Sequence, residues 1–402
     1  MQKESVTKLD SIFADRISDV PKSFIREILK VAVDETIISF AGGLPNRNLF
    51  PLQEIKIVTN KLLDEAGADV LQYSSTEGYK ELRVWIANRY KEKQNINIDL
   101  DNILITTGSQ QGLDLLGKTI LNEGDSVVME EPGYLGAIQA FSLYKSIFQS
   151  IPLNSDGIDI DKFAKAVDTS NSKLFYCVPN FQNPSGISYS EENRKRVSEI
   201  VKGKSILIVE DDPYGELRFL GNEKSSFYKL IPENTVLLGS FSKIVVPSFR
   251  IGWIVASDEI MDKLVVAKQA SDLHTNYFGQ RIIYEYLKEF DINQHIEIIK
   301  LAYGKQREAM VKAIEEHFPK EVQVTQPEGG MFLWVTLPEG ISAMEIFEKA
   351  IEKKVTFVPG DPFYINKKDV NTLRLNFSSV DEETIMIGIK RLGEVLDTII
   401  TD

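Results

Sequence analysis

Apolar residues in the middle of the chain form short continuous runs separated by longer stretches with helical spacing. These runs cover residues 103–107, 126–129, 174–178, 206–209, 236–238 and 252–256. Strands of a parallel sheet covered on both faces are continuously apolar because neither face meets water. The pattern therefore predicts an α/β fold with a mostly parallel sheet, which binds ligands at the carboxyl ends of its strands.

The flanking regions follow different patterns. A helix is expected over 23–33, a short strand over 37–45 that runs into a glycine pair, and two helical segments between 50 and 100. After the sheet region, a long amphipathic helix over 293–317 is expected to lead into a second unit. That unit combines β runs at 331–336, 355–358 and 373–377 with a helix over 381–397, which is typical of a small α+β domain.

Composition narrows the possible functions. The 402 residues exceed one ordinary core, and the net charge of −13 argues against nucleic acid or an anionic membrane as the main partner. The single cysteine, Cys177, excludes an intrachain disulfide and lies in an apolar run, and three histidines leave little for a His/Cys metal site. The N-terminus has no apolar signal segment and no run is long enough for a membrane span, so we expect a soluble cytoplasmic protein.

The stretch 239–253 carries the most suggestive chemistry. Lys243 lies between small hydroxyl residues, Ser240 and Ser242, and an apolar run, with Arg250 seven residues further on. An amine in apolar surroundings near another cation loses its proton more easily and becomes a nucleophile able to form a Schiff base. The hydroxyls and the guanidinium would suit a phosphate. Taken alone, such a stretch is more often an ordinary loop with a lysine and a nearby arginine.

Three further motifs follow predicted strands. Residues 106–112 (Thr-Thr-Gly-Ser-Gln-Gln-Gly) open a helix whose free N–H groups would cradle a phosphate, although Gly-Ser is also an ordinary N-cap. Tyr134 follows a Pro-Gly turn and would stack on a flat ring, or simply be an exposed turn aromatic. Asn183, in Asn-Pro-Ser-Gly, would donate to an anionic oxygen, although Asn-Pro is also a common turn signal.

Two motifs place charges at or within apolar runs. The strand at 206–209 leads into Glu-Asp-Asp-Pro-Tyr, and a buried Asp211 needs a cation such as a pyridinium N–H, with Tyr214 placed to bond the ring's phenolic oxygen. A metal-binding carboxylate pair is the alternative there. Arg374 lies within the run at 372–378 and would bind a substrate carboxylate, or form a structural ion pair.

Taken in order, five of these segments resemble the class I/II aminotransferases of fold type I, which depend on pyridoxal 5'-phosphate (PLP). They are Gly-Ser-Gln-Gln, Asn-Pro-x-Gly, Asp-x-Pro-Tyr, Ser-x-Ser-Lys with its later Arg, and Arg-Leu-Asn-Phe-Ser. Phe-Ala-Gly-Gly-Leu-Pro at 40–45 and Phe-Val-Pro-Gly at 357–360 are most similar to the 2-aminoadipate and kynurenine branch. The resemblance implies a large PLP-binding domain over 51–295, a small domain over 296–402, and an N-terminal segment, 1–50, that joins the small domain and the active site.

The resemblance also implies roles for individual residues. Lys243 would form the internal aldimine and carry the proton shift, and Asp211 would keep the pyridine nitrogen protonated. Asn183 and Tyr214 would bond the ring oxygen, and Tyr134 would cover the ring. The remaining ligands of the phosphate would be Ser109, Gln110, Ser240, Ser242 and Arg250, with Tyr73 reaching across from the neighbouring subunit of a homodimer.

On the substrate side, the resemblance implies that Arg374, Asn183 and the Gly43 backbone bind the α-carboxylate. Arg26 would read an acidic side chain, although a solvated helical arginine is equally compatible. The expected donor is 2-aminoadipate, glutamate or an aromatic amino acid, with 2-oxoglutarate as acceptor. Alternatives are a PLP-dependent β-lyase or decarboxylase, and a non-enzymatic PLP-sensing regulator domain, for which residues 40–43 come too early to leave room for a DNA-binding domain.

Overall fold

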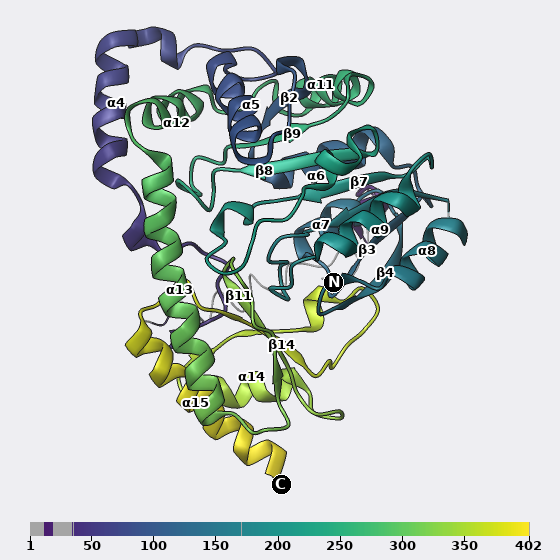
Figure 1. Cartoon of the computed structure of the whole chain (residues 1–402), viewed down its shortest axis with the longest axis vertical. Coiled ribbons are helices and arrows are strands. Elements are labelled where there is room, and N and C mark those ends of the chain that lie inside the picture. The colour runs from purple at the N-terminus through teal and green to yellow at the C-terminus, as the bar shows by residue number, and fades with distance from the viewer. Residues whose placement is uncertain (1–11, 19–33, 35, 170, 402) are drawn as a thin grey trace, which may run out of the picture.

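The computed structural model describes residues 12–18, 34, 36–169 and 171–401. The helix expected over 23–33, with Arg26, lies outside the described residues. Within the described part, the strands form an eight-stranded sheet, a four-stranded sheet and a two-stranded pair (Figure 1). No described helix combines the length and the apolar character that crossing a membrane requires.

The large sheet confirms the predicted mostly parallel arrangement. Its spatial order is β2-β9-β8-β7-β6-β3-β4-β5, in which β8, β7, β6, β3 and β4 pair in parallel while β9 and β5 run antiparallel to their neighbours. The strands are β2 (Ile103–Thr106), β3 (Ser126–Glu131), β4 (Ile147–Asn154), β5 (Gly157–Ile158), β6 (Ser172–Cys177), β7 (Leu207–Asp211), β8 (Thr235–Ser240) and β9 (Gly252–Val255).

Alternate residues of the central strands face two separate apolar cores. In β6, Leu174 and Tyr176 belong to the larger core, while Phe175 and Cys177 belong to the smaller one. Both faces are therefore covered, which explains why these strands read as continuous apolar runs. The helices of this part of the chain are α4 (Leu52–Ala66), α5 (Lys80–Gln94), α6 (Gly108–Ile120), α7 (Leu135–Ser142), α8 (Ile160–Thr169), α9 (Glu191–Val201), α10 (Phe227–Leu230), α11 (Asp258–Asp272) and α12 (Tyr277–Glu289).

The second sheet is wholly antiparallel in the order β10-β11-β14-β13. Its strands are β10 (Gln323–Val324), β11 (Phe332–Thr336), β13 (Val358–Pro359) and β14 (Thr372–Asn376), and the helices beside it are α14 (Ala343–Glu352) and α15 (Glu382–Thr401). The expectation of one strand over 355–358 was wrong. Buried Phe357 separates β12 (Val355–Thr356), which pairs with β1 (Ile38–Ser39), from β13, which pairs with β14.

A single long helix, α13 (Ile292–His317), runs along one side of the molecule from the end of α12 to α15 (Figure 1). Asp291 caps its start by accepting hydrogen bonds from the backbone N–H groups of Asn293 and Gln294. This helix confirms the long helix expected over 293–317. The remaining elements are α2 (Asp15–Ser18), η1 (Arg47–Leu49), η2 (Gly67–Leu71), η3 (Leu100–Asn102), η4 (Gly215–Leu217), η5 (Pro232–Asn234) and η6 (Asp361–Phe363).

Candidate active site

A cavity of about 340 Å³ lies where the carboxyl ends of the large sheet meet the second sheet and the segment after β1. Its lining is Gly43, Leu44, Pro45, Ser109, Gln110, Tyr134, Tyr176, Val178, Asn183, Asp211, Pro213, Tyr214, Ser240, Ser242, Lys243, Pro247, Arg250 and Arg374. Twelve of the fourteen site residues predicted from the sequence are in this set. A larger cavity of about 560 Å³ lies beside β10 and β11, but it contains none of those residues, so chemistry rather than size identifies the site.

Lys243 lies shortly after the end of β8, and it lines this cavity. Its Nζ donates a hydrogen bond of 2.8 Å to the carbonyl oxygen of Gly43, and its neighbours Phe241 and Ile244 are buried. Burial lowers the pKa of the amine to about 8, and the nearby guanidinium groups of Arg374 and Arg250 lower it in the same direction. A substantial neutral fraction near pH 8 makes this amine a nucleophile.

Asp211 is the last residue of β7 and is almost fully buried in the cavity wall. Its Oδ2 accepts a hydrogen bond of 2.9 Å from the hydroxyl of Tyr176, whereas its Oδ1 is buried without a hydrogen-bond partner among the described residues. Burial raises the pKa of this carboxyl to about 7, against the opposing effect of the Tyr176 bond. A buried acceptor of this kind calls for a charged donor inside the cavity.

The other two acidic residues of the run point elsewhere. Glu210 faces the opposite side of the sheet, as strand alternation requires, and accepts a hydrogen bond of 2.6 Å from the hydroxyl of Ser226. Asp212 accepts a hydrogen bond of 2.9 Å from the amide of Asn180. The three carboxylates therefore do not converge, and in the described part of the chain no group of three or more potential metal ligands is present.

Arg374 lies in β14 with its guanidinium buried beside the cavity. It donates to Asn183 Oδ1 at 2.8 Å and to the carbonyl oxygen of Ala41 at 2.8 Å, and it lies over the ring of Phe332. Burial lowers the pKa of this group to about 10. No ion pair joins it to a carboxylate of the described residues, and its Nε is buried without a partner. An incoming carboxylate would supply the missing charge.

Two residues beside Lys243 offer hydrogen-bond donors. Because Asn183 uses its Oδ1 for Arg374, its amide nitrogen remains available to the cavity. Tyr214 is also buried in the cavity wall, and burial raises the pKa of its phenol, so the hydroxyl keeps its proton at neutral pH. Both side chains can donate to one negatively charged oxygen.

An anion cradle lies at one end of the cavity. The first turn of α6 begins at Gly108, so the backbone N–H groups of Ser109 and Gln110 have no partner within the helix. Gly108 has a φ of 71°, and a Cβ there would lie 2.6 Å from a guanidinium nitrogen of Arg250. Hydroxyls complete the cradle: Ser240 Oγ donates to Ser242 Oγ at 2.9 Å. Helix N–H groups, hydroxyls and a guanidinium together suit a phosphate.

One wall of the cavity is aromatic. Tyr134, directly before α7, is nearly parallel to Tyr176, with ring centroids 6.5 Å apart. We did not single out Tyr176 from the sequence, because it lies within the apolar run at 174–178. The available signal was its phenol, since a tyrosine in a fully buried strand needs a hydrogen-bond partner.

Two predicted residues are not in this cavity. Tyr73 is 79% exposed, its ring meets His274 edge to face with the centroids 5.8 Å apart, and it does not line the cavity of its own chain. Arg26 lies outside the described residues.

The chain is similar to known aminotransferases over most of its length. Residues 43–392 match the family described as aminotransferase class I and II. The chain is 42% identical to aromatic-amino-acid aminotransferase 1 of Thermococcus litoralis, over 96% of this chain and 94% of the relative. It is also 42% identical to the 2-aminoadipate transaminase of Thermus thermophilus, over 94% of each chain.

Solved structures show the same likeness. An alpha-aminoadipate aminotransferase from Thermus thermophilus, complexed with N-(5'-phosphopyridoxyl)-L-leucine, superposes with a TM-score of 0.91 at 40% identity and covers 98% of this chain and 99% of its own. A kynurenine aminotransferase from Pyrococcus horikoshii superposes with a TM-score of 0.93 at 40% identity, with the same coverage.

Proposed function

The chain belongs to the class I and II aminotransferases and catalyses PLP-dependent transamination of amino acids, and from this premise we propose that the cavity around Lys243 is its active site. The observation that carries the proposal is the presence, in one cavity, of a lysine with a lowered pKa and a buried carboxylate of which one oxygen, Asp211 Oδ1, has no hydrogen-bond partner among the described residues.

The residues present fit pyridoxal phosphate. The unpartnered Oδ1 of Asp211 would accept a hydrogen bond from the protonated pyridine nitrogen, which supplies the cation that this buried carboxylate lacks. At the other end, the cradle formed by the first turn of α6, the two serines and Arg250 suits the phosphate. When bound, the cofactor supplies an aldehyde that bonds to amines and a ring that withdraws electrons.

Lys243 would be the amine that bonds to the aldehyde and afterwards the base that moves the substrate α-proton. Its lowered pKa serves both tasks, because only the neutral amine attacks a carbonyl or accepts a proton. The hydrogen bond from Nζ to the carbonyl oxygen of Gly43 orients the amine beside the segment that would hold the substrate carboxylate.

Three residues would control the charge of the ring. Asp211 would hold a proton on the ring nitrogen, which strengthens its electron withdrawal. Asn183 and Tyr214 would donate to the ring oxygen and stabilise its negative charge. Tyr134 would cover one face of the ring, where it already lies nearly parallel to Tyr176.

The phosphate would be held by Ser109 and Gln110 through their backbone N–H groups, and by Ser240, Ser242 and Arg250 through their side chains. We propose that the protein is a homodimer and that Tyr73 of each subunit contacts the phosphate of the other. The 79% exposure of this tyrosine supports the idea, since a large aromatic side chain so placed is available to a second copy.

The substrate α-carboxylate would bind to Arg374, with Asn183 and the Gly43 backbone N–H as further donors. Arg374 has no described carboxylate partner and an unpartnered Nε, so a bidentate contact with a carboxylate would satisfy it.

The donor side chain would lie against the apolar part of the lining, formed by Leu44, Pro45, Val178 and Pro247. Every described cation of the lining already has a role, so this wall favours an aromatic or other apolar donor. An acidic donor such as 2-aminoadipate or glutamate would need Arg26. We propose that both kinds of donor react, as the names of the relatives suggest, with 2-oxoglutarate as acceptor.

We also propose the division into a joining segment over 1–50, a PLP-binding domain over 51–295 and a small domain over 296–402. The position of α13, which leads from the large sheet to the second sheet, supports the later boundary. A cytoplasmic location fits the cysteine-poor, acidic chain.

The experiment that tests this function begins with the absorbance of the purified protein. A band between roughly 360 and 430 nm, fixed by borohydride onto the peptide that contains Lys243, is the expected result. Amino donors are then screened with 2-oxoglutarate, and formation of glutamate is measured. A colourless protein that does not respond to added PLP would overturn the proposal, and release of ammonia and pyruvate without glutamate would indicate a β-lyase.

A further inference from the structure

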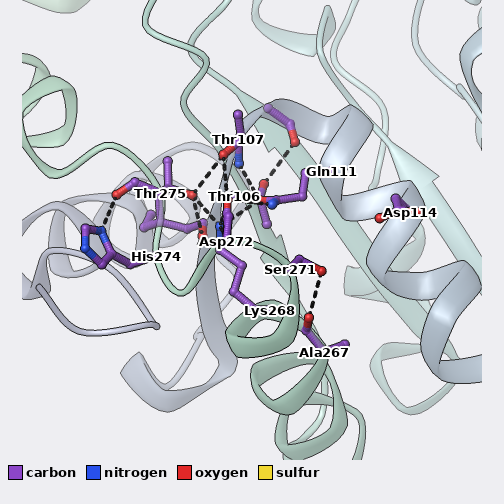
Figure 2. A network of polar contacts seen from close by, with 12 residues as sticks. Thr106, Thr107, Gln111, Asp114, Ala267, Lys268, Ser271, Asp272, His274 and Thr275 are labelled. Carbon is purple, nitrogen blue, oxygen red and sulfur yellow. Dashed lines mark hydrogen bonds and ion pairs between the residues drawn. The ribbon is translucent and has the colours of Figure 1, made fainter. Parts of the chain in front are cut away.

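A fully buried lysine lies outside the cavity, in α11. The amine of Lys268 donates to Gln111 Oε1 at 2.7 Å, to the two carboxylate oxygens of Asp272 at 2.6 and 2.8 Å, and to Thr275 Oγ1 at 2.8 Å (Figure 2). Burial lowers its pKa, while Asp272 opposes that effect. Lysines are rarely buried unless they are paired, because the desolvation of the ammonium is costly. This lysine therefore holds its partners in fixed positions.

These partners are also hydrogen-bonded to residues at the first turn of α6. Gln111 Oε1 also accepts a hydrogen bond of 2.8 Å from the backbone N–H of Thr107, and Gln111 Nε2 donates to Asp272 Oδ2 at 2.7 Å. The hydroxyl of Thr107 donates to the same carboxylate oxygen at 3.2 Å (Figure 2). Thr107 and Gln111 lie on either side of Gly108, Ser109 and Gln110. The network thus fixes both ends of the turn that forms the anion cradle.

The network continues towards Tyr73. Thr275 follows His274, whose Nδ1 lies 2.9 Å from the carbonyl oxygen of Thr275. His274 Nε2 accepts a hydrogen bond of 3.3 Å from the backbone N–H of Ser74, so Nδ1 carries the proton and donates. The ring of Tyr73 rests against His274. One set of contacts therefore joins the cradle of this chain to the segment that carries Tyr73.

We propose that Lys268 is a positioning residue for the cofactor phosphate. It does not line the cavity and acts through Gln111, by fixing the direction in which the N–H groups of Ser109 and Gln110 point. The inference rests on the proposed function, in which these two N–H groups bind the phosphate. A misdirected helix turn would weaken binding of the phosphate and leave binding of the ring unchanged.

The chain offers a matched control in Lys118. It also joins α6 to α11, by donating to Asp114 at 2.6 Å on its own helix and to Ser271 Oγ at 2.9 Å on the other. It lies in the last turn of α6, away from the cradle. A change at Lys118 therefore tests whether any loss of contact between the two helices has the same effect.

The test compares affinity for PLP with affinity for pyridoxal, which lacks the phosphate, by absorbance titration of the full chain. We expect Lys268→Met to reduce the preference for PLP by roughly tenfold, which is the effect of one or two misplaced hydrogen bonds to a charged group. Affinity for pyridoxal should stay within about twofold, and Lys118→Met should leave both values unchanged. Gln111→Met, which keeps the pair of Lys268 and Asp272, should shift the preference in the same direction.

Three results would overturn the inference. They are an equal loss of affinity for PLP and pyridoxal, no loss of either, and a loss of preference in Lys118→Met as large as that in Lys268→Met. If Lys268→Met does not fold, Gln111→Met decides between the same outcomes. A wild-type protein without any preference for PLP over pyridoxal would instead overturn the proposed cradle itself, so the two failures are distinguishable.

Discussion

The hydroxyl of Tyr176 donates a hydrogen bond of 2.9 Å to Asp211 Oδ2, and both side chains are buried in the wall of the cavity. The bond stabilises the charged form of the carboxyl and so opposes the effect of burial, which raises its pKa to about 7. Tyr176 thus helps to keep Asp211 ionised at the pH at which it has to pair with a ring N–H.

Replacing Tyr176 by Phe should therefore raise the pKa of Asp211. The acidic limb of the profile of kcat/KM against pH should move to higher pH by up to about one unit, since one pKa unit corresponds to about 1.4 kcal/mol, the upper range of one hydrogen bond. Activity on this acidic limb should fall several-fold and recover at higher pH. Tyr189→Phe is the control, because the Tyr189 hydroxyl donates an equally short bond, 2.9 Å, to buried Glu130 outside the cavity. An unchanged acidic limb in Tyr176→Phe would contradict the role.

Lys243 should lower the stability of the cofactor-free protein. Its pKa is about 8 in the folded state and 10.5 without burial, so between these values the unfolded chain holds more protons. The free energy of unfolding should therefore rise with pH through this window. Lys243→Met removes the cost, and at pH 7 it should stabilise the cofactor-free protein by about 2 kcal/mol, after allowance for the lost bond to Gly43.

Urea unfolding of the two cofactor-free proteins at pH 7 and near pH 10 measures this effect. The difference between Lys243→Met and the wild type should shrink at the higher pH. If the variant is less stable than the wild type at pH 7, or if the difference in stability between the two proteins does not depend on pH, then burial of the charged amine does not destabilise the folded protein.

Much of the fold and site followed from the apolar runs. Parallel strands end at one edge of a sheet, so motifs after separate runs were expected to meet, and Asp211, Lys243 and Asn183 do line one cavity. Strand β4, which lies between β3 and the edge strand β5, was missed because its burial is only partial, and its sequence mixes polar with apolar residues. Similarly, nothing in the sequence of the run at 355–358 indicated that its two ends pair with strands of different sheets.

The side-chain hydrogen-bond networks could not be predicted from the sequence. Lys268 and Gln111 lie more than 150 positions apart, on two different helices. Whether such a lysine is buried depends on the packing angle of two helices, which no local pattern encodes. Tyr176 was hidden for a different reason, because its ring fits an apolar run and its hydroxyl partner is 35 positions away.

The proposed role of Arg26 predicts a change of donor preference. Arg26→Ala should lower kcat/KM for 2-aminoadipate and glutamate by at least roughly tenfold, because a charge-assisted hydrogen bond to a carboxylate contributes about 1.5–3 kcal/mol. Aromatic donors should lose less than about twofold, since they contact the apolar wall. Arg196→Ala, which removes a charge from the exposed side of α9, controls for net charge. An equal loss for both classes of donor would remove the proposed role.

The dimer and the role of Tyr73 can be tested in one mixing experiment. In a homodimer with exchanged tyrosines, each site combines Lys243 of one chain with Tyr73 of the other. The Tyr73→Ala variant should lose most of its activity at limiting PLP concentrations. The Lys243→Ala variant should lose most of its activity at every PLP concentration. Mixed subunits should regain activity, because a two-fold dimer of one of each contains one site with both residues intact. As the control, Tyr73→Ala is mixed with the double variant Tyr73→Ala/Lys243→Ala, because no intact site can then form. If the first mixture gains no more activity than the control although mixed dimers form, Tyr73 acts within its own chain or not at all.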